Sequence, residues 1–591
     1  MSAPLAVGGG RSGLTPRPLQ VLGEYALALA HLARSRLSAE WAGFPLYRIL
    51  LDRPAATYLA FTPRDFRPVS VARGREILAG RLSLDGETAE IGVHGDPWDM
   101  PSPSRRFAVA LHRFAWLPDL LATGAEGERE ALRLFVTWRA EFEPLSPFVW
   151  GAETLERRVV NLACGAHRMT PHASEQEARL LAVMLARQAR RLADLSGPDV
   201  RRAERLAAAC AGAGALADPV GGALLRRLLV RLARALDRAV GEDGGIATRS
   251  PQQGLELLYD LLTVDDLLTQ RGVAPPAELS RAIDALSATT AYLKLRDGRL
   301  ARFQGGEAVS ANAVDGALAQ FDPDAAPAAG GGRGGYQRIA SRQIEVLADA
   351  AAPARGPFSV TACDQPLALE IVCNGDRLIT NTGWSPDAHL PASLRLAEGG
   401  SAASLGETAT GRVLTGLRGS GLGARLIGAS GSVSVQRTET DDGAWLELAH
   451  DGWARTAGLI HTRRLFLDHH AAELRGEDAF VRVKDRRRRR GAAYAIRFHV
   501  APGVQVSLAR DERSVLIRGA SDQGWWLRND SRGVTLEPSL VSDPGGARRS
   551  TQIVLRGFVP PEAEDGRVRW KLSPVDAAAE PGRRRGREAE A

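Results

Sequence analysis

The sequence contains few of the features that by themselves assign a protein to a structural class. Its 591 residues include four cysteines, too few for a disulfide framework in a chain of this length. No run of about 18 apolar residues occurs, so we expect no transmembrane helix. Lysine is nearly absent: only Lys294, Lys484 and Lys571 are lysines among 76 basic residues. Because arginine takes the place of lysine throughout, we interpret the arginine excess as a coding habit and give it little weight as a sign of nucleic-acid binding.

A secretory signal is also missing from the start of the sequence. Met1–Pro18 is rich in glycine, proline and serine, and it lacks a basic segment followed by an apolar stretch. Leu19–Leu37 mixes charged residues with apolar ones, which predicts an amphipathic helix. We therefore expect residues 1–39 to form an N-terminal extension, and the missing signal favours the cytoplasm.

The composition is that of a folded chain with a mildly positive charge. Hydrophobic residues make up 44% and charged residues 25%, and the net charge is +7. Such a surface favours anionic partners, including acidic polysaccharides. The run Arg486–Arg490 fits either a solvated turn or a contact patch for phosphate or sulfate. No aromatic residue interleaves this run, so RNA bases would have no stacking partner, and we expect no nucleic acid.

The hydrophobic pattern changes its period once, at Gly330–Gly335. Before these glycines the apolar residues recur at helical spacing. Helix starts are marked by Ser174…Glu177 and by Ser250-Pro251, which have the spacing of N-terminal caps. Arg106–Thr123 is predicted as the first strong helix. Serial helices joined by short connections predict an incomplete α/α barrel or a bundle over residues 40–322.

The second half of the chain reads as antiparallel β-structure. A linker rich in glycine and proline, 323–335, precedes it. Turn dipeptides such as Asn374-Gly375 then separate short alternating runs. A dozen or so such strands predict a large β-sandwich over residues 336–575, followed by a disordered tail at 576–591. A similar signal at Asp85-Gly86 predicts a short hairpin at the start of the helical half. The fold class is therefore α+β, in more than one domain.

Aromatic and polar residues of the helical half are candidates for sugar binding, because rings stack on sugar faces and arginines pair with uronate or sulfate groups. The candidates are His112, Trp116, Trp138, Trp150, His167, His172, Arg249 and Tyr259. The tryptophans equally fit a place in the core of amphipathic helices. On three separate predicted strands, His450, His461 and His499 could converge on a metal or be hydrogen-bonded structural residues. No compact metal-ligand spacing occurs.

Several short blocks follow one another in a characteristic order. They are Asp96-Pro97-Trp98, Leu111-His112-Arg113-Phe114, Asp243-Gly244-Gly245, Arg249-Ser250-Pro251, Gly335-Tyr336-Gln337-Arg338, Asn381…Gly383, His450-Asp451-Gly452, His461…Arg463, Arg475-Gly476-Glu477-Asp478 and Arg497-Phe498-His499. In this order they resemble the alphaproteobacterial branch of the heparinase II/III-like proteins, from about residue 40 to residue 560.

The resemblance implies an N-terminal α/α toroid, a C-terminal antiparallel β-sandwich, and a cleft between them that binds acidic polysaccharide. Enzymes of this family are lyases that perform β-elimination at a uronic acid. The reaction needs a group that neutralises the uronate carboxylate, a base for the C5 proton and an acid for the departing O4. On this hypothesis Arg249 neutralises the carboxylate, Tyr259 is the base or acid, and His167 is the third catalytic residue. The substrate-binding candidates are His112, Trp116, Trp150, Arg157 and His450.

The chain departs from the family pattern at four positions. Where the relatives carry histidine, it has Gly165, Ile246, Cys363 and Gly400. Glycine and isoleucine neither transfer protons nor bind metals, so we predict no metal site, although a divalent metal is a family possibility. The alternative function is a catalytically impaired protein that binds acidic glycan or takes part in envelope assembly. The resemblance favours the cell envelope or periplasm, against the cytoplasm suggested by the missing signal, and the oligomeric state stays open.

Overall fold

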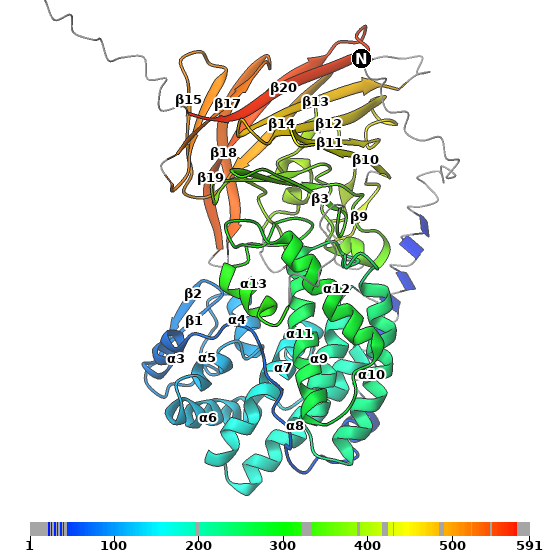
Figure 1. Ribbon diagram of the computed structural model, residues 1–591. Coiled ribbons are helices and arrows are strands. Elements are labelled where there is room, and N and C mark those ends of the chain that lie inside the picture. The colour runs from blue at the N-terminus through cyan, green and yellow to red at the C-terminus, as the bar shows by residue number, and fades with distance from the viewer. Residues whose placement is uncertain are drawn as a thin grey trace, which may run out of the picture.

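The computed structural model describes residues 22–575 apart from short gaps. The gaps are 24, 27–28, 31, 34–35, 38–39, 41–43, 196–199, 322–331, 387–389, 416–422, 430, 484–489, 522 and 544–545. The described residues between 22 and 37 are helical, as predicted for Leu19–Leu37. The predicted tail at 576–591, most of the linker at 323–335 and most of the arginine run Arg486–Arg490 lie outside the described residues. Helices fill one half of the molecule and strands the other (Figure 1).

The helical half is an α/α toroid built from successive helices that pack side by side. Its helices are α2 (Pro45–Asp52), α3 (Val71–Leu78), α4 (Arg105–His112), α5 (Leu117–Leu121), α6 (Ala125–Phe142), α7 (Ala152–Met169), α8 (Glu175–Leu195), α9 (Arg202–Gly214), α10 (Val220–Ala239), α11 (Pro251–Gln270), α12 (Ala277–Leu293) and α13 (Ala311–Leu318). The alanine-rich helix α9 contacts α7, α8, α10 and α11. Its residues from Ala203 to Gly214 are all buried, because small side chains let the neighbouring helices approach closely.

The predicted helix Arg106–Thr123 is wrong in one respect, because two helices occupy this segment. Helix α4 ends at His112 and α5 begins at Leu117, and Phe114 between them has φ +56°. Pro118 gives the physical reason. In a continuous helix its ring would press against the carbonyl of Phe114, four residues earlier, so the chain starts a new helix with proline near its N-terminus instead.

Both turn dipeptides form the predicted hairpins. Strands β1 (Arg81–Leu84) and β2 (Glu87–Glu90) are joined by Asp85-Gly86, whose φ angles are +50° and +82°. In the second half, Asn374 and Gly375 have φ +50° and +84° and join two paired strands. Positive φ at both central residues is what a type I′ turn requires, and Asn, Asp and Gly tolerate it best.

The second half is a β-sandwich of two eight-stranded antiparallel sheets. Its strands are β3 (Tyr336–Ala340), β4 (Ile344–Asp349), β5 (Leu369–Cys373), β6 (Asp376–Thr380), β7 (Ala403–Leu405), β8 (Arg412–Val413), β9 (Leu426–Ile427), β10 (Val433–Glu439), β11 (Gly443–His450), β12 (Leu459–Asp468), β13 (Glu473–Arg482), β14 (Ala492–Val500), β15 (Gln505–Leu508), β16 (Ser514–Arg518), β17 (Gly524–Asn529), β18 (Gly533–Asp543), β19 (Gly546–Val559) and β20 (Asp565–Pro574). The inner sheet has the order β18-β19-β14-β6-β5-β4-β3, with β7 paired to β14. The outer sheet has the order β10-β11-β12-β13-β20-β17-β16-β15, and the short strands β8 and β9 pair with each other outside both sheets.

The inner sheet faces the helical half, with loops between its strands and the ends of the helices (Figure 1). Tyr336, Leu347 and Val372 of this sheet belong to the same hydrophobic cluster as the toroid interior. Arg338 donates to the carbonyl of Lys294 over 2.8 Å, which ties β3 to the end of α12. The two halves therefore share buried surface and pack as one unit. None of the helices in the described part of the chain combines the length and apolar character needed to cross a bilayer.

Candidate functional site at the domain junction

The loop between α10 and α11 reaches the sandwich and carries the Asp243-Gly244-Gly245 block. Oδ1 of Asp243 accepts a hydrogen bond from the Gly245 amide at 2.9 Å, and Oδ2 accepts one from the Gly334 amide at 3.0 Å. Gly244 has φ +75°, and a Cβ there would lie 2.2 Å from the carbonyl oxygen of Ala285. The block therefore holds the loop against both α12 and the start of the sandwich.

Arg249 extends from this loop into the sandwich. Its Nη1 donates to the carbonyls of Ala351 and Ala352 at 2.9 and 3.0 Å. Its Nη2 donates to the carbonyl of Gly335 at 3.0 Å and pairs with Asp349 Oδ1 at 2.5 Å. Burial alone would lower the pKa of Arg249, but the Asp349 carboxylate outweighs burial and raises it. The predicted partner of a uronate carboxylate is thus engaged with a carboxylate of its own chain.

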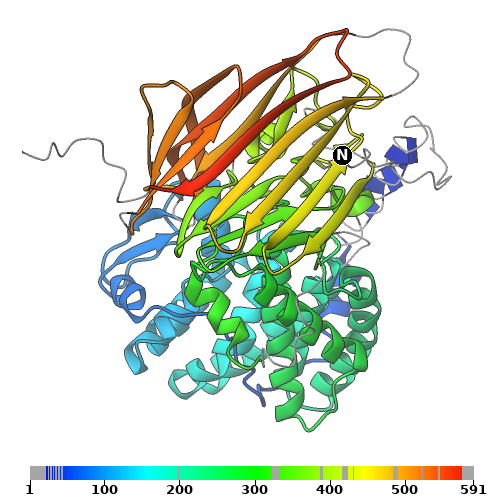
Figure 2. The same cartoon turned by 45° about the horizontal axis from the view of Figure 1, so that its top comes forward.

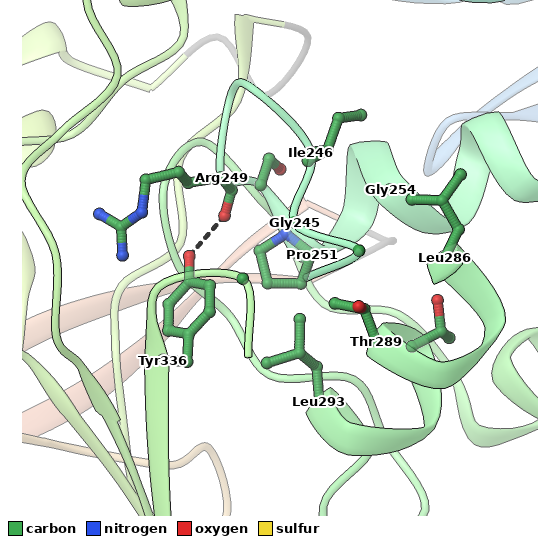
Figure 3. Close-up of a pocket in the computed structure, with 13 residues that line it drawn as sticks. Gly245, Ile246, Arg249, Pro251, Gly254, Leu286, Thr289, Leu293 and Tyr336 are labelled. Carbon is green, nitrogen blue, oxygen red and sulfur yellow. Dashed lines mark hydrogen bonds between the residues drawn. The ribbon is translucent and has the colours of Figure 1, made fainter. Parts of the chain in front are cut away.

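Tyr336 and Gln304 complete a closed network around this ion pair. The Tyr336 hydroxyl donates to the Arg249 carbonyl, and its ring lies 5.0 Å from the guanidinium carbon (Figure 3). Gln304 Nε2 donates to Asp349 Oδ2 at 2.7 Å, and the Cys363 amide donates to Gln304 Oε1 at 3.1 Å. Sequence reasoning missed Asp349 and Gln304. The only signal for Asp349 was an acidic residue at the end of a strand that also contains Glu345.

A small apolar cavity lies beside this network at the junction. Figure 3 shows Ile246, Pro251, Leu286 and Leu293 around it, with Tyr336 on the sandwich side. Its volume is about 20 Å³, which accommodates a water molecule or two. A sugar ring does not fit a space of this size. Ile246, at a position where the family resemblance predicts histidine, contributes an apolar side chain to its wall.

The three predicted catalytic residues do not meet in one cleft. Tyr259 lies nine residues beyond Ser250 on α11, about 13 Å along the helix axis. Its buried hydroxyl donates to the Ala313 carbonyl, its ring lies 4.7 Å from the Arg67 guanidinium carbon, and burial raises its pKa to about 12. His167 is exposed in the last turn of α7.

Three predicted substrate-binding residues, His112, Trp116 and Trp150, belong to an aromatic core around the buried Arg158. Arg158 donates to the His112 carbonyl at 2.9 Å and lies 4.7 Å from the Trp138 ring. Trp138 Nε1 in turn donates to His112 Nδ1 at 3.2 Å. The indole nitrogens of Trp116 and Trp150 donate to main-chain carbonyls. Burial lowers the pKa of His112 to about 4, so this ring is neutral and serves as an acceptor inside the core.

Arg157 lies in a separate, half-buried ion network of the toroid. It pairs with Asp65, and with Asp260 at 3.2 Å. Arg67 joins the same two carboxylates at 3.2 and 3.0 Å and adds Glu256 at 2.7 Å. Burial raises the pKa of Asp260 to about 6 against the opposing effect of the two arginines. The charge of Arg157 is therefore balanced by carboxylates of the chain itself.

His450, the remaining substrate-binding candidate, is buried between the two sheets. Its Nδ1 accepts from the Gly452 amide at 3.2 Å, and its ring centroid lies 5.2 Å from that of His461. His461 Nε2 bonds to Asp478 Oδ1 at 2.8 Å. His499 is held elsewhere, by the Ser539 hydroxyl at 2.7 Å and the Glu398 carbonyl at 3.0 Å. Within the described ranges, no three His, Cys, Asp or Glu side chains are arranged to hold a metal ion.

At two further positions where the family resemblance predicts histidine, Gly165 and Gly400, neighbouring side chains pack closely against the glycine. A Cβ on Gly165 would come within 2.7 Å of Leu121 Cδ1, in the contact between α7 and α5. A Cβ on Gly400 would come within 2.9 Å of Gln365 Cβ. Both distances are shorter than ordinary van der Waals contact, so a side chain at either position would require its neighbours to move.

An α/α toroid followed by a two-sheet β-sandwich is the fold class of this molecule. Comparisons with known proteins identify its family. The sequence model described as "Heparinase II/III-like, C-terminal" matches residues 323–571. FtsZ-localized protein C of Caulobacter vibrioides (strain NA1000 / CB15N) is 46% identical over 549 residues, which cover 92% of this chain and 95% of that protein. The chain belongs to the heparinase II/III-like family.

Solved structures of polysaccharide lyases share the fold at low sequence identity. The crystal structure of heparinase III matches with a TM-score of 0.68 and 11% identity, covering 95% of this chain and 92% of that one. Heparan sulfate lyase HepC from Pedobacter heparinus matches with a TM-score of 0.53, 14% identity and coverage of 97% and 92%. The Streptomyces coelicolor A3 chondroitin AC lyase in complex with chondroitin sulphate matches at 0.51 and 13%, with coverage of 85% and 78%. At these identities the likeness concerns the fold alone.

Proposed function

We propose that this chain is a non-catalytic member of its family that acts as an assembly module together with FtsZ in cell division. The observation that carries the proposal is the closed junction between the two halves. The cavity lined by Ile246 holds about 20 Å³, and the neighbouring Arg249 donates to Asp349 and to three main-chain carbonyls. A uronate therefore has neither room nor an available cation at this point.

The chemistry of β-elimination supports the same proposal. Carboxylate neutralisation, proton abstraction and leaving-group protonation must all act on one sugar unit, within hydrogen-bond distance of it. Here Arg249 lies at the junction, Tyr259 lies inside the toroid and His167 lies on the surface of α7. No conformational change of a single side chain brings these three groups to one substrate.

The similarity to a protein named for its location with FtsZ supports the second part of the proposal. That relative shares nearly its whole length with this chain, at 46% identity. Surfaces that direct a protein to its place in the cell are part of this shared length, so we infer the same place for this chain. On this proposal the principal partner is a protein assembly and not an acidic polysaccharide.

The full-length likeness to heparinase III favours a second candidate function. On that candidate the chain performs β-elimination on an acidic polysaccharide of the cell envelope, through Tyr259, His167 and Arg249. It requires a sugar-binding cleft that opens at the junction, with Arg249 released from Asp349. The two candidates differ in one direct observable, the formation of unsaturated uronate.

Localisation tests the proposed function in living cells. We expect a fluorescent fusion of this chain, produced in Caulobacter vibrioides cells that lack their own FtsZ-localized protein C, to form a band that coincides with labelled FtsZ. Depletion of FtsZ should disperse the band, while the fluorescent protein alone stays uniform throughout. A uniform distribution of the fusion, or a band that persists without FtsZ, contradicts the proposal.

A further inference from the structure

A broad groove lies on the outer face of the outer sheet, on the side away from the toroid. Its volume is about 570 Å³, within the range of sites that bind ligands. Figure 2 shows this face, formed by the yellow strands β10–β13 and the red strand β20, turned toward the viewer, and no helix of the described part of the chain covers it. The groove shares no residue with the junction cavity, and the proposed function does not use it.

Strand register places five groove side chains in one row. The row consists of Trp445, Phe466, Arg475, Lys571 and Arg528, in this order. Each residue is the direct register partner of the next, on strands β11, β12, β13, β20 and β17. Directly paired residues of antiparallel strands project from the same face. Because neighbouring strands lie about 4.8 Å apart, the row is about 19 Å long.

A second row runs beside the first and balances its own charges. It consists of Glu447, Arg464, Glu477 and Arg569, again as direct register partners. Arg464 pairs with Glu447 at 3.0 Å and with Glu477 at 3.3 Å, and Arg569 pairs with Glu477 at 3.0 Å. Two cations and two carboxylates alternate, so this row forms one side of the groove without an excess of charge.

The first row carries an excess of positive charge. Arg475 and Lys571 share the carboxylate of Glu473, at 2.5 and 2.9 Å. Arg528 donates to the hydroxyl of Ser573 at 3.3 Å. The first row thus has three basic side chains against the single carboxylate of Glu473, whereas the second row is neutral. An anionic partner is therefore the one whose charge this surface complements.

The other end of the first row is aromatic and exposed. Trp445 keeps 52% of its surface exposed, and its ring centroid lies 4.4 Å from that of Phe466. Arg475 lies 5.8 Å from the Phe466 ring, at the point where the aromatic end meets the cationic end. Tryptophan and arginine are the residue types that contribute most to protein–protein binding energy, and exposed aromatic patches mark such contacts.

We propose that this groove binds a short, extended, acidic segment of a partner protein. An apolar side chain of the segment packs on Trp445 and Phe466, and its carboxylates pair with Arg475, Lys571 and Arg528. An extended chain advances about 3.3 Å per residue, so about six residues span the row. Arg475, the first basic residue of the row, lies two strands from Trp445. We therefore expect the acidic residues of the bound segment to begin about three positions after its apolar residue. The proposal does not depend on where in the cell the chain acts.

The uneven distribution of rings and charges favours a peptide over an acidic polysaccharide. A polysaccharide repeats the same ring and the same carboxylate along its length, so a groove made for it would alternate aromatic and basic side chains. Within the lining, the outward-facing rings Trp445 and Phe466 lie together at one end, and three basic side chains without a ring between them follow. Trp570 does not add a third ring to the lining, because its buried ring donates from Nε1 to Asp478 inside the sandwich at 3.0 Å. Just outside the lining, Trp526 places one further outward-facing ring beside Arg528, 5.4 Å from its guanidinium carbon.

Fluorescence anisotropy with a defined probe tests the proposal on the full chain. The probe is a fluorescein-labelled synthetic peptide in which two glycines and then four aspartates follow a single phenylalanine. We expect Trp445→Ala and the double variant Arg475→Glu/Arg528→Glu each to weaken binding about tenfold or more. Arg518→Glu is the matched control, since Arg518 is an exposed arginine of β16 outside the groove lining. Added salt should weaken binding to the wild type, because exposed charges are screened.

Three outcomes overturn the proposal. The first is that the probe does not bind the wild type, and the second is that both groove variants bind it as well as Arg518→Glu does. The third is that heparin oligosaccharides bind more tightly than the peptide and lose affinity in the same variants, which assigns the groove to a glycan. Thermal unfolding of each variant verifies its fold, and the double variant carries the test if Trp445→Ala does not fold.

Discussion

Asp478→Asn is expected to destabilise the β-sandwich by about 3–5 kcal/mol, because it removes one partner from a buried charge cluster. Asp478 Oδ1 accepts from Arg463 Nε at 2.7 Å and from His461 Nε2 at 2.8 Å, and Oδ2 accepts from Trp570 Nε1 at 3.0 Å. The three partners of the Asp478 carboxylate, Arg463, His461 and Trp570, are all buried. An asparagine would direct an amide N–H group at one of these donors and leave the guanidinium of Arg463 without a counter-charge.

Chemical denaturation followed by tryptophan fluorescence measures this effect. The matched control is Asp441→Asn, at an exposed carboxylate in the turn between β10 and β11 of the same sandwich. We expect the control to change the free energy of unfolding by less than about 0.5 kcal/mol. An Asp478→Asn protein as stable as the control would show that this cluster does not stabilise the sandwich.

The difference in stability between wild type and Asp478→Asn should itself depend on pH. Burial alone would raise the pKa of Asp478, but Arg463 and His461 outweigh burial and hold it well below its usual value of 3.8. The carboxylate therefore contributes its full stability above the unfolded-state pKa and loses it as the pH falls toward the folded-state pKa. The difference between the two proteins should be constant above about pH 5 and shrink below about pH 4. A difference that grows on acidification would contradict this assignment.

Arg249→Leu is expected to loosen the sandwich from the toroid, at a cost of about 3–5 kcal/mol. The variant leaves Asp349 as a buried carboxylate without its cation and removes the donors of three main-chain carbonyls. Scanning calorimetry should show a lower transition temperature and a separation of the unfolding of the two halves. Arg249→Lys should be intermediate, because an ammonium group keeps the charge and loses the planar set of donors.

The control for this prediction is Arg281→Leu on the surface of α12. Arg281 pairs with Asp237 at 2.5 Å, but about two thirds of its side chain is exposed. Exposed ion pairs contribute little, about 0–1 kcal/mol, so the control should unfold almost as the wild type does. If Arg249→Leu also unfolds as the wild type does, the junction is held by its apolar contacts, and Arg249 is available for another role.

The fold could be predicted from the sequence because it is encoded locally. The change of hydrophobic period and the turn dipeptides are signals that span only a few residues. The structure confirms the hairpins predicted at Asp85-Gly86 and Asn374-Gly375. The break in Arg106–Thr123 was missed because helical periodicity continues across it, although Pro118 signals it. Hydrophobic periodicity predicts which face of a helix is apolar, but it does not predict where the helix ends.

The candidate site could be predicted only in its residue types. Arg249 and Asp349 are 100 positions apart, so their ion pair appears only when the loop after α10 meets strand β4. Likewise, His112 and Arg157 are polar residues that suit a cleft, yet their partners lie on other helices and take them into the interior. The groove needed strand register, since Trp445 and Arg528 stand at the two ends of one row only through the pairing of five strands.

The most direct test of the closed junction is the ultraviolet absorbance of unsaturated uronate, recorded with purified protein over a panel of acidic polysaccharides, with and without added divalent metal. We predict a flat trace on every polymer, because the cavity at the junction is too small for a sugar ring and Arg249 is already paired with Asp349. Growth of the signal, abolished by Tyr259→Phe, would contradict this account and establish a lyase.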